Sequence, residues 1–359
     1  MQPNYLQRQT AFKANLNKHG LSAMLVLGYE NIRYLSGFSG NAAYALITQN
    51  SCVLITDYRY FERASNECQG FDVISRDRDN ETLGHCINRF LPANAVLGFD
   101  AAFINVALWQ QVADELKVQS VLPIQGLIEQ QRLIKDEWEV RQLKAAAALS
   151  DEALAQTLPY FTQGVTERDL ALELEFRMQK LGSKGMAFDT ILMFAERTSL
   201  PHGTPSERPL AVGDFITLDF GAVVNGYRSD MTRSYIYGEA SEKQTCIYNA
   251  VRDAQIAAMG LLAPNVSCKT LQQASQQVLD GSGYGEYSGK GLGHGVGLFL
   301  HEQPFITEHN NFALQAGNVI TIEPGIYVPD FGGVRLEDDI LITQTGYEVL
   351  THAPKPFII

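Results

Sequence analysis

The chain has 359 residues, of which 45% are hydrophobic and 19% charged, a composition typical of a globular protein long enough for two domains. Its formal net charge of −12 argues against a general role in binding nucleic acids or anionic membranes. The N-terminal sequence is polar and no apolar run is long enough to span a bilayer, which predicts a cytoplasmic location.

The acidic residues are unevenly distributed along the chain. Residues 1–130 carry 10 Lys and Arg against 12 Asp and Glu, whereas residues 131–359 carry 18 against 28. The five cysteines are odd in number, widely spaced and without a CxxC pair, which argues against a disulfide framework or a zinc knuckle. We therefore expect reduced, mostly buried thiols.

The first part of the chain predicts a small mixed α/β domain. Short apolar runs at 22–28, 43–48, 51–56 and 96–100 are typical of strands. Helical patterns cover 5–18, 59–68, 81–90 and 107–117. The pattern changes near 125–136, so we expect one domain over 1–128 and a second over 129–359.

The second part predicts an α+β domain. The segment DEWEVRQLKAAAALSDEALAQTL is a long helical pattern that Asp136 is placed to cap. A second helix follows Thr166, which matches a capping-box start, and ends before Gly182. Helices near 241–262 and 268–280 separate strand-like segments, which favours a mostly antiparallel sheet interleaved with helices.

One hairpin can be read residue by residue in FITLDFGAVVNGYRSDMTRSY. Asn225-Gly226 is a strong type I′ turn signal, and that turn places Gly221 opposite Asp230. Because strand side chains alternate with period two, Asp219 and Asp230 then share one face as diagonal neighbours, within reach of a common ion. Gly221 is expected to leave open space beside the two carboxylates.

The same alternation applies further along the chain. Glu323 ends the strand-like segment NVITIE, and in GVRLEDD the alternation places Arg335 and Glu337 on one face with Asp339, so we expect Arg335 beside Glu337. In GKGLGHGVG every second residue from 289 to 297 is glycine, which allows a ligand or another strand to approach closely, while His294 projects to the other face.

A single acidic residue in a strand is usually solvated, and a single histidine is usually a hydrogen-bonded core or surface residue. These explanations fit any one of the candidate residues Asp219, Asp230, His294, Glu323 and Glu337 taken alone. They fit poorly for all five together, because the five lie on apolar strands with a consistent alternation. Four carboxylates and one imidazole, without a thiolate, favour Mn²⁺, Co²⁺ or Zn²⁺. Two divalent ions would balance the four negative charges, could share a water and could polarise a carbonyl. The predicted ligands are Asp219, Asp230, His294, Glu323 and Glu337.

The strings LDFGAVVNGYRSDMTR, GHGVGLFLHEQP, TIEPGIYVP and GGVRLEDD, in this order, resemble the pita-bread metallopeptidases. The most similar members are the Xaa-Pro peptidases, aminopeptidase P and prolidase, and the resemblance covers about 132–346. NIRYLSGFSG and TDYRYF are similar to the creatinase-type N-terminal domain of this group. The resemblance implies a pita-bread catalytic domain preceded by a smaller α/β domain.

The resemblance also implies a role for each ligand. Asp219 matches a chelating ligand of one ion, and Asp230 and Glu337 match carboxylates that bridge both ions. His294 and Glu323 match the remaining ligands of the second ion, and Glu323 would also accept a proton from the attacking water.

Three further residues are implied by the motifs around them. His202, in LPHGTP, matches a histidine that contacts substrate near the scissile bond. His301, in LHEQP, matches a histidine that hydrogen-bonds the carbonyl oxygen as it becomes an oxyanion. Arg335 matches an arginine that supports these groups by fixing a ligating carboxylate.

The chain departs from the family pattern at two positions. Relatives often have a histidine where this chain has Lys290 and a small hydroxyl residue where it has Leu292. Lysine near two dications would be repelled, so we expect Lys290 to face solvent. Arg59 and Tyr60, in TDYRYF, are weak candidates for substrate contacts, with a structural role at a strand end favoured.

Together these observations predict a cytoplasmic Xaa-Pro aminopeptidase with two divalent ions, Mn²⁺ first and Co²⁺ or Zn²⁺ as alternatives. Its substrate would be a peptide with proline at the second position, and the resemblance implies a homodimer. An Xaa-Pro dipeptidase is the main alternative, although the group that would hold the dipeptide's free carboxylate is not identifiable. A metal-free creatinase-type hydrolase and a non-catalytic binding protein are weaker alternatives, because all predicted ligands are present.

Overall fold

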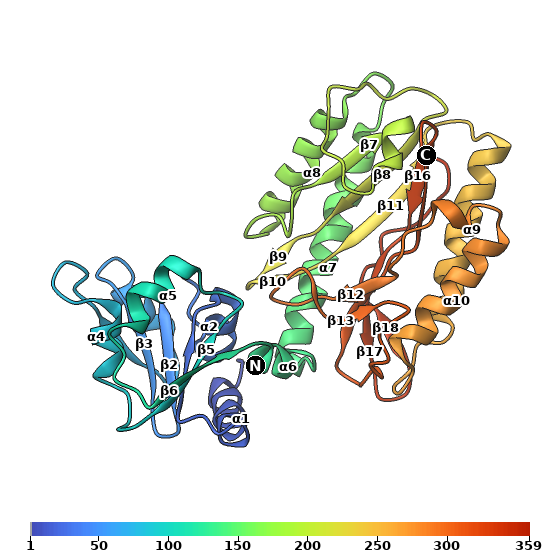
Figure 1. Ribbon diagram of the computed structural model, residues 1–359. Coiled ribbons are helices and arrows are strands. Elements are labelled where there is room, and N and C mark those ends of the chain that lie inside the picture. Colours follow the sequence, from blue (N-terminus) through green and yellow to red (C-terminus); the bar gives the residue numbers. More distant parts are fainter. Residues whose placement is uncertain (1) are drawn as a thin grey trace. The chain divides into compact units, whose positions relative to one another are not determined.

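The chain is described by a computed structural model over residues 2–359, which divide into two compact units (Figure 1). The first unit extends to Arg132 and the second runs from Leu133 to Ile359. Helix α6, Leu127–Arg132, ends the first unit, and residues 133–136 lead into the first long helix of the second.

The first unit is built on a six-stranded mixed sheet in the order β4-β3-β2-β1-β5-β6. β2 pairs antiparallel with β1 and β3, and the outer pairings are parallel. Four of the strands match the predicted runs, but β4 and β6 were not predicted, because their residues are mostly half-exposed or exposed. The strands are β1 Ala23–Val26, β2 Tyr44–Thr48, β3 Cys52–Thr56, β4 Asp72–Ser75, β5 Val96–Asp100 and β6 Ser120–Ile124.

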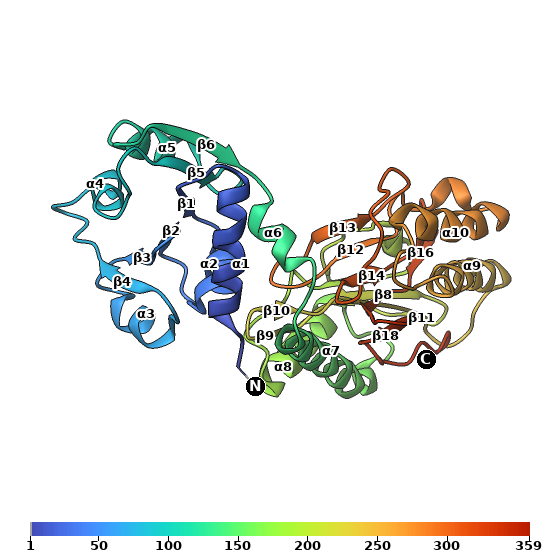
Figure 2. The ribbon, with the colours of Figure 1, turned by 90° about the horizontal axis from the view of Figure 1, so that it is seen from below.

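Helices cover both faces of this sheet. α4 and α5 pack on one face through a core cluster that includes Leu83, Ile87 and Val112, while α1 and α2 pack against each other on the opposite face (Figure 2). Helix α2 was not predicted. The helices are α1 Tyr5–Lys18, α2 Tyr29–Ser36, α3 Phe61–Glu67, α4 Leu83–Asn88 and α5 Val106–Ala113, followed by α6.

Four long helices frame the second unit, and their boundaries follow local signals. Asp136 caps α7 in a full capping box, in which its side chain accepts from the amide of Glu139 and Glu139 bonds the amide of Asp136. Thr166 caps α8, which ends at the left-handed Gly182. The helices are α7 Glu137–Thr157, α8 Glu167–Leu181, α9 Glu242–Met259 and α10 Cys268–Gly281, with short 3₁₀ helices η1 Leu158–Tyr160, η2 Ala195–Ser199 and η3 Gly285–Tyr287.

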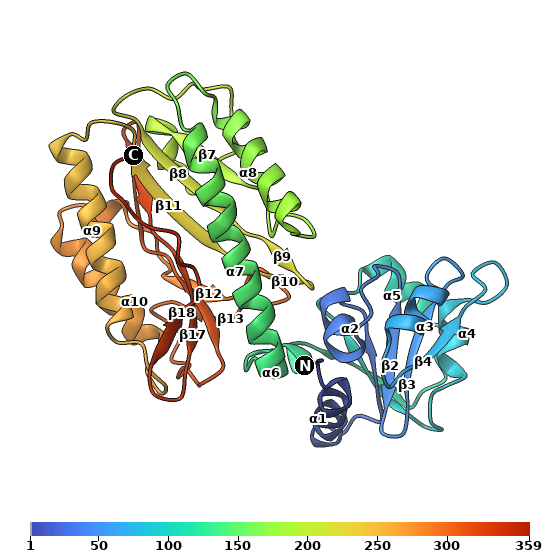
Figure 3. The ribbon, with the colours of Figure 1, turned by 180° about the vertical axis from the view of Figure 1, so that it is seen from behind.

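The helices lie in two pairs over antiparallel sheets, which confirms the α+β prediction. α7 and α8 lie side by side over the three-stranded sheet β11-β8-β7, and α9 and α10 lie side by side over the five-stranded sheet β13-β12-β14-β17-β18 (Figure 3). Two-stranded ribbons, β10-β9 and β15-β16, complete the unit. The strands are β7 Ile191–Phe194, β8 Phe215–Phe220, β9 Val223–Val224, β10 Tyr227–Arg228, β11 Met231–Ile236, β12 Gly293–Gly295, β13 Glu302–Ile306, β14 Val319–Ile322, β15 Gly325–Val328, β16 Gly332–Arg335, β17 Asp338–Ile342 and β18 Tyr347–Val349.

The predicted hairpin register is confirmed. Asn225 and Gly226 both have positive φ, as a type I′ turn requires, and Asp219 lies opposite Thr232. The expectation of open space at Gly221 is wrong, because a Cβ there would lie 1.9 Å from the carbonyl oxygen of Ser229. Glycine is needed at this position for close backbone approach within the hairpin.

Two expectations from composition can be compared with the structure. Within residues 2–359 the cysteines are free thiols, and Cys52, Cys86 and Cys268 are buried. Among the same residues, none of the helices combines the length and the apolar character that crossing a bilayer requires.

Candidate metal centre

Five side chains on or directly beside separate strands line one cavity of about 930 Å³. One comes from β8, one directly precedes β11, one belongs to β12, one directly follows β14 and one lies between β16 and β17. Each position is at a strand or its end, so the two sheets hold the set in place. The five residues are Asp219, Asp230, His294, Glu323 and Glu337.

The ligand atoms approach one another closely. One atom from each of Asp230, His294 and Glu337 lies within 4.8 Å of the others. The Nε2 atom of His294 is 3.2 Å from Glu323 Oε1 and 3.7 Å from Asp230 Oδ2. Its Nδ1 atom lies 3.0 Å from the carbonyl oxygen of Gly295, which can only accept, so the Nδ1 proton points there. With Nδ1 as the donor to Gly295, loss of the Nε2 proton leaves Nε2 as the electron-pair donor that a metal ion requires.

The carboxylates are buried beyond what the protein itself satisfies. Within residues 2–359, Asp219 Oδ1 and Glu337 Oε1 are buried without a hydrogen-bond partner, and Asp339 Oδ1 nearby shares this state. Unpartnered buried oxygens are costly, and buried carboxylates more so. Oxygen-rich donors with one imidazole suit divalent cations, so these residues fit a metal centre.

Electrostatics at the centre show the same excess of negative charge. Burial, followed by repulsion from neighbouring carboxylates, raises the pKa of both Asp230 and Glu337 well above their usual values. Burial also raises the pKa of Asp219, although Arg335 opposes this. At Glu323 burial is outweighed by His294, so that the pKa of this carboxyl is lowered. Cations placed among these groups would favour their ionised forms.

Arg335 lies beside Glu337, as the sequence predicted, and is linked to it through a hydroxyl. Its Nη2 atom donates to Asp219 Oδ2 at 2.5 Å and its Nε atom donates to Thr232 Oγ1 at 3.0 Å. Thr232 in turn donates to Glu337 Oε2 at 2.6 Å. Arg335 and Glu337 line the same cavity, and the charge of Arg335 opposes the rise in the pKa of Glu337.

His202 and His301 line the same cavity as the five ligands. The ring centroid of His301 lies 4.4 Å from that of His294, in an edge-to-face arrangement. Burial, and then the charge of His294, lowers the pKa of His301, which favours its neutral form. The loop of His202 is attached to the centre at Pro201, whose carbonyl oxygen accepts from Arg335 Nη1 at 3.2 Å.

Glu167 was missed by the sequence analysis, although it anchors the loop that carries His202. This fully buried carboxylate accepts from the amide of Phe194 at 2.8 Å, from the amide of Ser206 at 2.7 Å and from Arg197 Nε at 3.1 Å. The loop between these amides is therefore attached to α8 at both ends. Glutamate in a first helical turn is common for electrostatic reasons, so the sequence offered no distinguishing signal.

The remaining predicted positions behave differently from the ligands. Lys290 is exposed, as expected, and Leu292 packs in a core cluster with Ile320 and Ile340. Arg59 Nε donates to Asp57 at 2.9 Å, consistent with the favoured structural role at the end of β3. A Cβ at Gly295 would lie 2.3 Å from the carbonyl oxygen of Gln303, which confirms that glycine allows a neighbouring strand to approach.

Comparison with known proteins identifies the family. The model of metallopeptidase family M24 matches residues 141–344, and that of the creatinase/prolidase N-terminal domain matches residues 8–134. The chain belongs to metallopeptidase family M24. It is 34% identical to a Xaa-Pro dipeptidase from Pyrococcus horikoshii, with 96% of each chain covered, and 36% identical to an uncharacterized peptidase of Bacillus subtilis, with 95% of this chain and 96% of the relative covered.

Solved structures of this M24 group agree closely. A Xaa-Pro dipeptidase from Bacillus anthracis superposes with a TM-score of 0.94 at 34% identity, covering 99% of this chain and all of the other. An X-Pro aminopeptidase from Thermotoga maritima gives 0.89 at 32% identity, covering 98% and 99%. The predicted pita-bread fold with its creatinase-type domain is confirmed. The protein is a metallopeptidase that hydrolyses peptide bonds, so the non-catalytic alternative is wrong.

Proposed function

We propose that this M24 enzyme is a Xaa-Pro dipeptidase that uses two divalent ions. The observation that carries the proposal is the cluster of buried, under-satisfied carboxylates at the floor of the cavity. The preference for proline is supported by the names of relatives that match nearly the whole chain. The same names favour the dipeptidase over the aminopeptidase that the sequence analysis put first.

Each ligand has a place in this proposal. The carboxylates of Asp219, Asp230, Glu323 and Glu337 and the imidazole of His294 would together hold the two ions, with Mn²⁺ as the first candidate. Bound divalent ions would supply a nucleophile from water near neutral pH and polarise the scissile carbonyl.

The remaining chemistry belongs to protein side chains. Glu323 would act as the proton carrier, which is supported by its place in the lining of the cavity and by its hydrogen bond from Thr321 Oγ1 at 2.9 Å. It would take a proton from the attacking water and deliver it to the proline nitrogen. His202 and His301 would donate hydrogen bonds to the carbonyl oxygen as negative charge develops there. Arg335 would keep Asp219 in its ligating orientation.

A Xaa-Pro aminopeptidase acting on longer peptides is the second candidate. It is supported by the similarity to the X-Pro aminopeptidase from Thermotoga maritima. It is also supported by the arginine side chains of the cavity, which are already paired and so are not free to bind a substrate carboxylate. Among the described residues that line the cavity, the arginines are Arg168 and Arg335, and both already pair with carboxylates, Glu207 and Asp219. A dipeptidase would need a further group for the free substrate carboxylate, such as a histidine, a hydroxyl, a backbone amide, or Arg168 released from its exposed pair.

Parallel hydrolysis assays of Ala-Pro, Ala-Pro-Ala and Ala-Ala with Mn²⁺ test the proposal. We expect turnover of Ala-Pro, much slower turnover of Ala-Pro-Ala, and little cleavage of Ala-Ala. Faster cleavage of the tripeptide would favour the aminopeptidase. If Ala-Ala were cleaved at the same rate as the two proline peptides, the proposed preference for proline would be wrong.

A further inference from the structure

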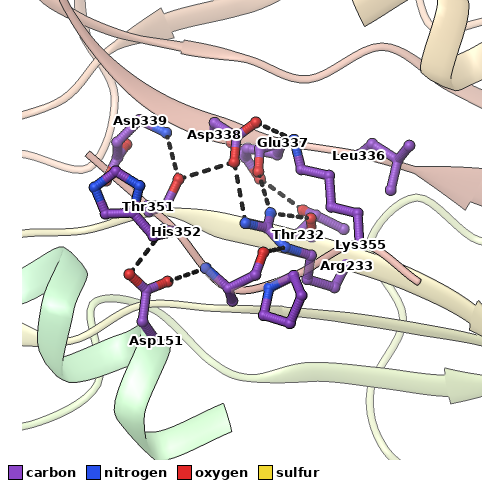
Figure 4. Close-up of polar contacts among 12 residues, drawn as sticks. Asp151, Thr232, Arg233, Leu336, Glu337, Asp338, Asp339, Thr351, His352 and Lys355 are labelled. Atoms are coloured by element: carbon purple, nitrogen blue, oxygen red, sulfur yellow. Dashed lines mark hydrogen bonds and ion pairs between the residues drawn. The ribbon is translucent and has the colours of Figure 1, made fainter. Parts of the chain in front are cut away.

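A fully buried arginine lies directly behind the metal centre. Arg233 Nη1 donates to the carbonyl oxygens of Thr232 at 3.0 Å and of Glu337 at 2.6 Å (Figure 4). Thr232 is the residue whose hydroxyl bonds the Glu337 carboxylate. One guanidinium therefore holds the backbone of the Glu337 ligand and the backbone of the residue that orients its side chain.

The charge of Arg233 is balanced by a buried carboxylate. Arg233 Nη2 lies 3.0 Å from Asp338 Oδ1, and both side chains are almost completely excluded from solvent. Asp338 also accepts from Gln255 Nε2 at 3.0 Å. Because Asp338 directly follows Glu337 in sequence, any movement of this pair moves the ligand. A buried ion pair of this kind requires well-placed partners to hold its geometry.

Those partners come from the end of the chain. We call residues 351–355 the C-terminal strap. Thr351 Oγ1 donates to Asp338 Oδ1 at 3.0 Å, Lys355 Nζ pairs with Asp338 Oδ2, and Ala353 accepts from Arg233 Nε at 2.9 Å (Figure 4). The strap thus contacts both members of the ion pair.

The strap is itself fixed to helix α7. Asp151 accepts from the amides of His352 at 2.8 Å and Ala353 at 2.7 Å, and Figure 4 shows both bonds. Thr351 Oγ1 also accepts from the amide of Asp339 at 3.2 Å. The Asp339 carboxylate, in turn, accepts from the amide of Asp230, a second metal-site residue.

We propose that the C-terminal strap, acting through the buried Arg233–Asp338 pair, is a positioning device that sets the metal affinity of the centre. It restricts the backbone of Glu337 and, through Asp339, that of Asp230, so the ligands are held in their binding arrangement before metal enters. Groups that orient metal ligands change affinity by about 10–100-fold when removed. The inference rests on the proposed ligand roles of Glu337 and Asp230.

The test weakens the strap at its accessible contacts rather than at the buried pair. Lys355→Met removes the ammonium but keeps most of the side chain, and Asp151→Ala releases the two strap amides. Binding of Mn²⁺ to the metal-free full-length protein is measured by isothermal titration calorimetry. The double variant, Lys355→Met with Asp151→Ala, is expected to bind Mn²⁺ at least about tenfold more weakly than the wild type. Lys355→Arg keeps a cation and is expected to retain much of the affinity that Lys355→Met loses. At saturating Mn²⁺ the kcat of the double variant should return close to the wild-type value.

Two controls separate positioning from general effects. Lys144→Met removes the exposed Lys144–Glu348 pair of the same unit, and Leu279→Ala lowers stability by creating a cavity in the core. Both should bind Mn²⁺ like the wild type. The inference is overturned if the double variant also binds within twofold of the wild type, or if Leu279→Ala loses as much affinity.

Glu337→Gln, titrated alongside, distinguishes failure of the inference from failure of the proposed site. If Glu337→Gln loses affinity while the strap variants keep it, the ligand role stands and the strap has no positioning role. If Glu337→Gln also keeps wild-type affinity, the proposed metal centre is wrong, and the inference falls with it.

Discussion

Both units of the protein bury carboxylates, but within residues 2–359 it is the second unit that leaves buried carboxylate oxygens without a hydrogen-bond partner. In the first unit, Asp100 accepts from Asn31 Nδ2 at 3.2 Å, and the same amide group donates to Glu129 at 2.6 Å. The Asn31 oxygen accepts from the buried Arg132 at 2.8 Å. Burial raises the pKa of Asp100 only to about 6. This network contains its own hydrogen-bond donors and its own cation.

The acidic cluster of the second unit lacks this balance. Asp219 and Glu337 each keep a buried oxygen without a partner, and the pKa of Asp230 is raised well above its usual value by burial and by its neighbours. The strand scaffold holds these groups together at the expense of stability, as is common at functional sites. A balanced buried network is therefore structural, whereas an over-acidic and under-satisfied one marks a ligand site.

Replacing Asp230 should produce the largest effect. Asp230→Asn is expected to lower Xaa-Pro hydrolysis by more than about 100-fold, the upper range for groups that only support a ligand. It should also raise the melting temperature of the metal-free protein, because the Asp230 carboxyl, whose pKa is raised, has to take up a proton on folding at neutral pH, whereas asparagine does not. Activity assays and calorimetric melting check both effects. A less stable metal-free variant with normal activity would contradict the distinction between the two regions.

Replacing Arg132 in the first unit should have the opposite effect to Asp230→Asn, with lower stability and unchanged metal binding. Arg132→Met is expected to destabilise that unit by about 1–3 kcal/mol, because the buried Asn31 oxygen loses its hydrogen-bond donor. Affinity for Mn²⁺ should stay at the wild-type value. Urea unfolding followed by tryptophan fluorescence, with calorimetric titration of Mn²⁺, measures the two quantities. Unchanged unfolding would show that the network does not have the structural role inferred here.

Glu167 is a buried carboxylate of the second unit whose oxygens have hydrogen-bond partners, and it supports the site without being a metal ligand. Glu167→Gln should lower kcat about tenfold by loosening the loop that carries His202, while Mn²⁺ affinity stays unchanged. The matched control is Glu173→Gln on the same helix, which removes only a surface pair with Arg177. Equal kcat values for the two variants would exclude a positioning role for Glu167.

Asp339 provides a smaller, pH-dependent test. Burial raises its pKa from 3.8 to about 8, so the folded metal-free protein keeps a proton that the unfolded chain releases above pH about 4. This contribution to stability is complete below pH about 4 and is lost as the pH rises to about 8. Asp339→Asn should therefore reduce the fall in unfolding free energy between pH 5 and pH 8. An identical fall in variant and wild type would contradict the assignment.

The hairpin and the shared face of Asp219 and Asp230 were predictable from the sequence because local rules govern them. The Asn225-Gly226 turn determines the register, and strand alternation then places Asp219 and Asp230 on one face. The same rule places Arg335 beside Glu337. The ion pair between Arg335 and Asp219 was not predictable, because it joins two strands that are far apart in the sequence.

The supporting groups were not predictable for a different reason. Arg233 and Glu167 look like ordinary strand and helix residues, and apart from the adjacent Thr232 the partners described above lie more than 25 positions away in the sequence. Their importance arises from tertiary packing, which brings the end of the chain behind Glu337 and the loop of His202 onto α8. A single sequence carries no spacing signal for such contacts.

Counting the metal ions bound per chain is the most direct test of whether the acidic cluster of the second unit binds two divalent ions. The metal-free protein is saturated with Mn²⁺, freed of unbound ion by gel filtration, and measured by inductively coupled plasma mass spectrometry beside Asp230→Asn. The account predicts two Mn²⁺ per wild-type chain and fewer in the variant. Wild-type protein that retains no stoichiometric Mn²⁺, Co²⁺ or Zn²⁺, or a variant that retains the full complement, would contradict it.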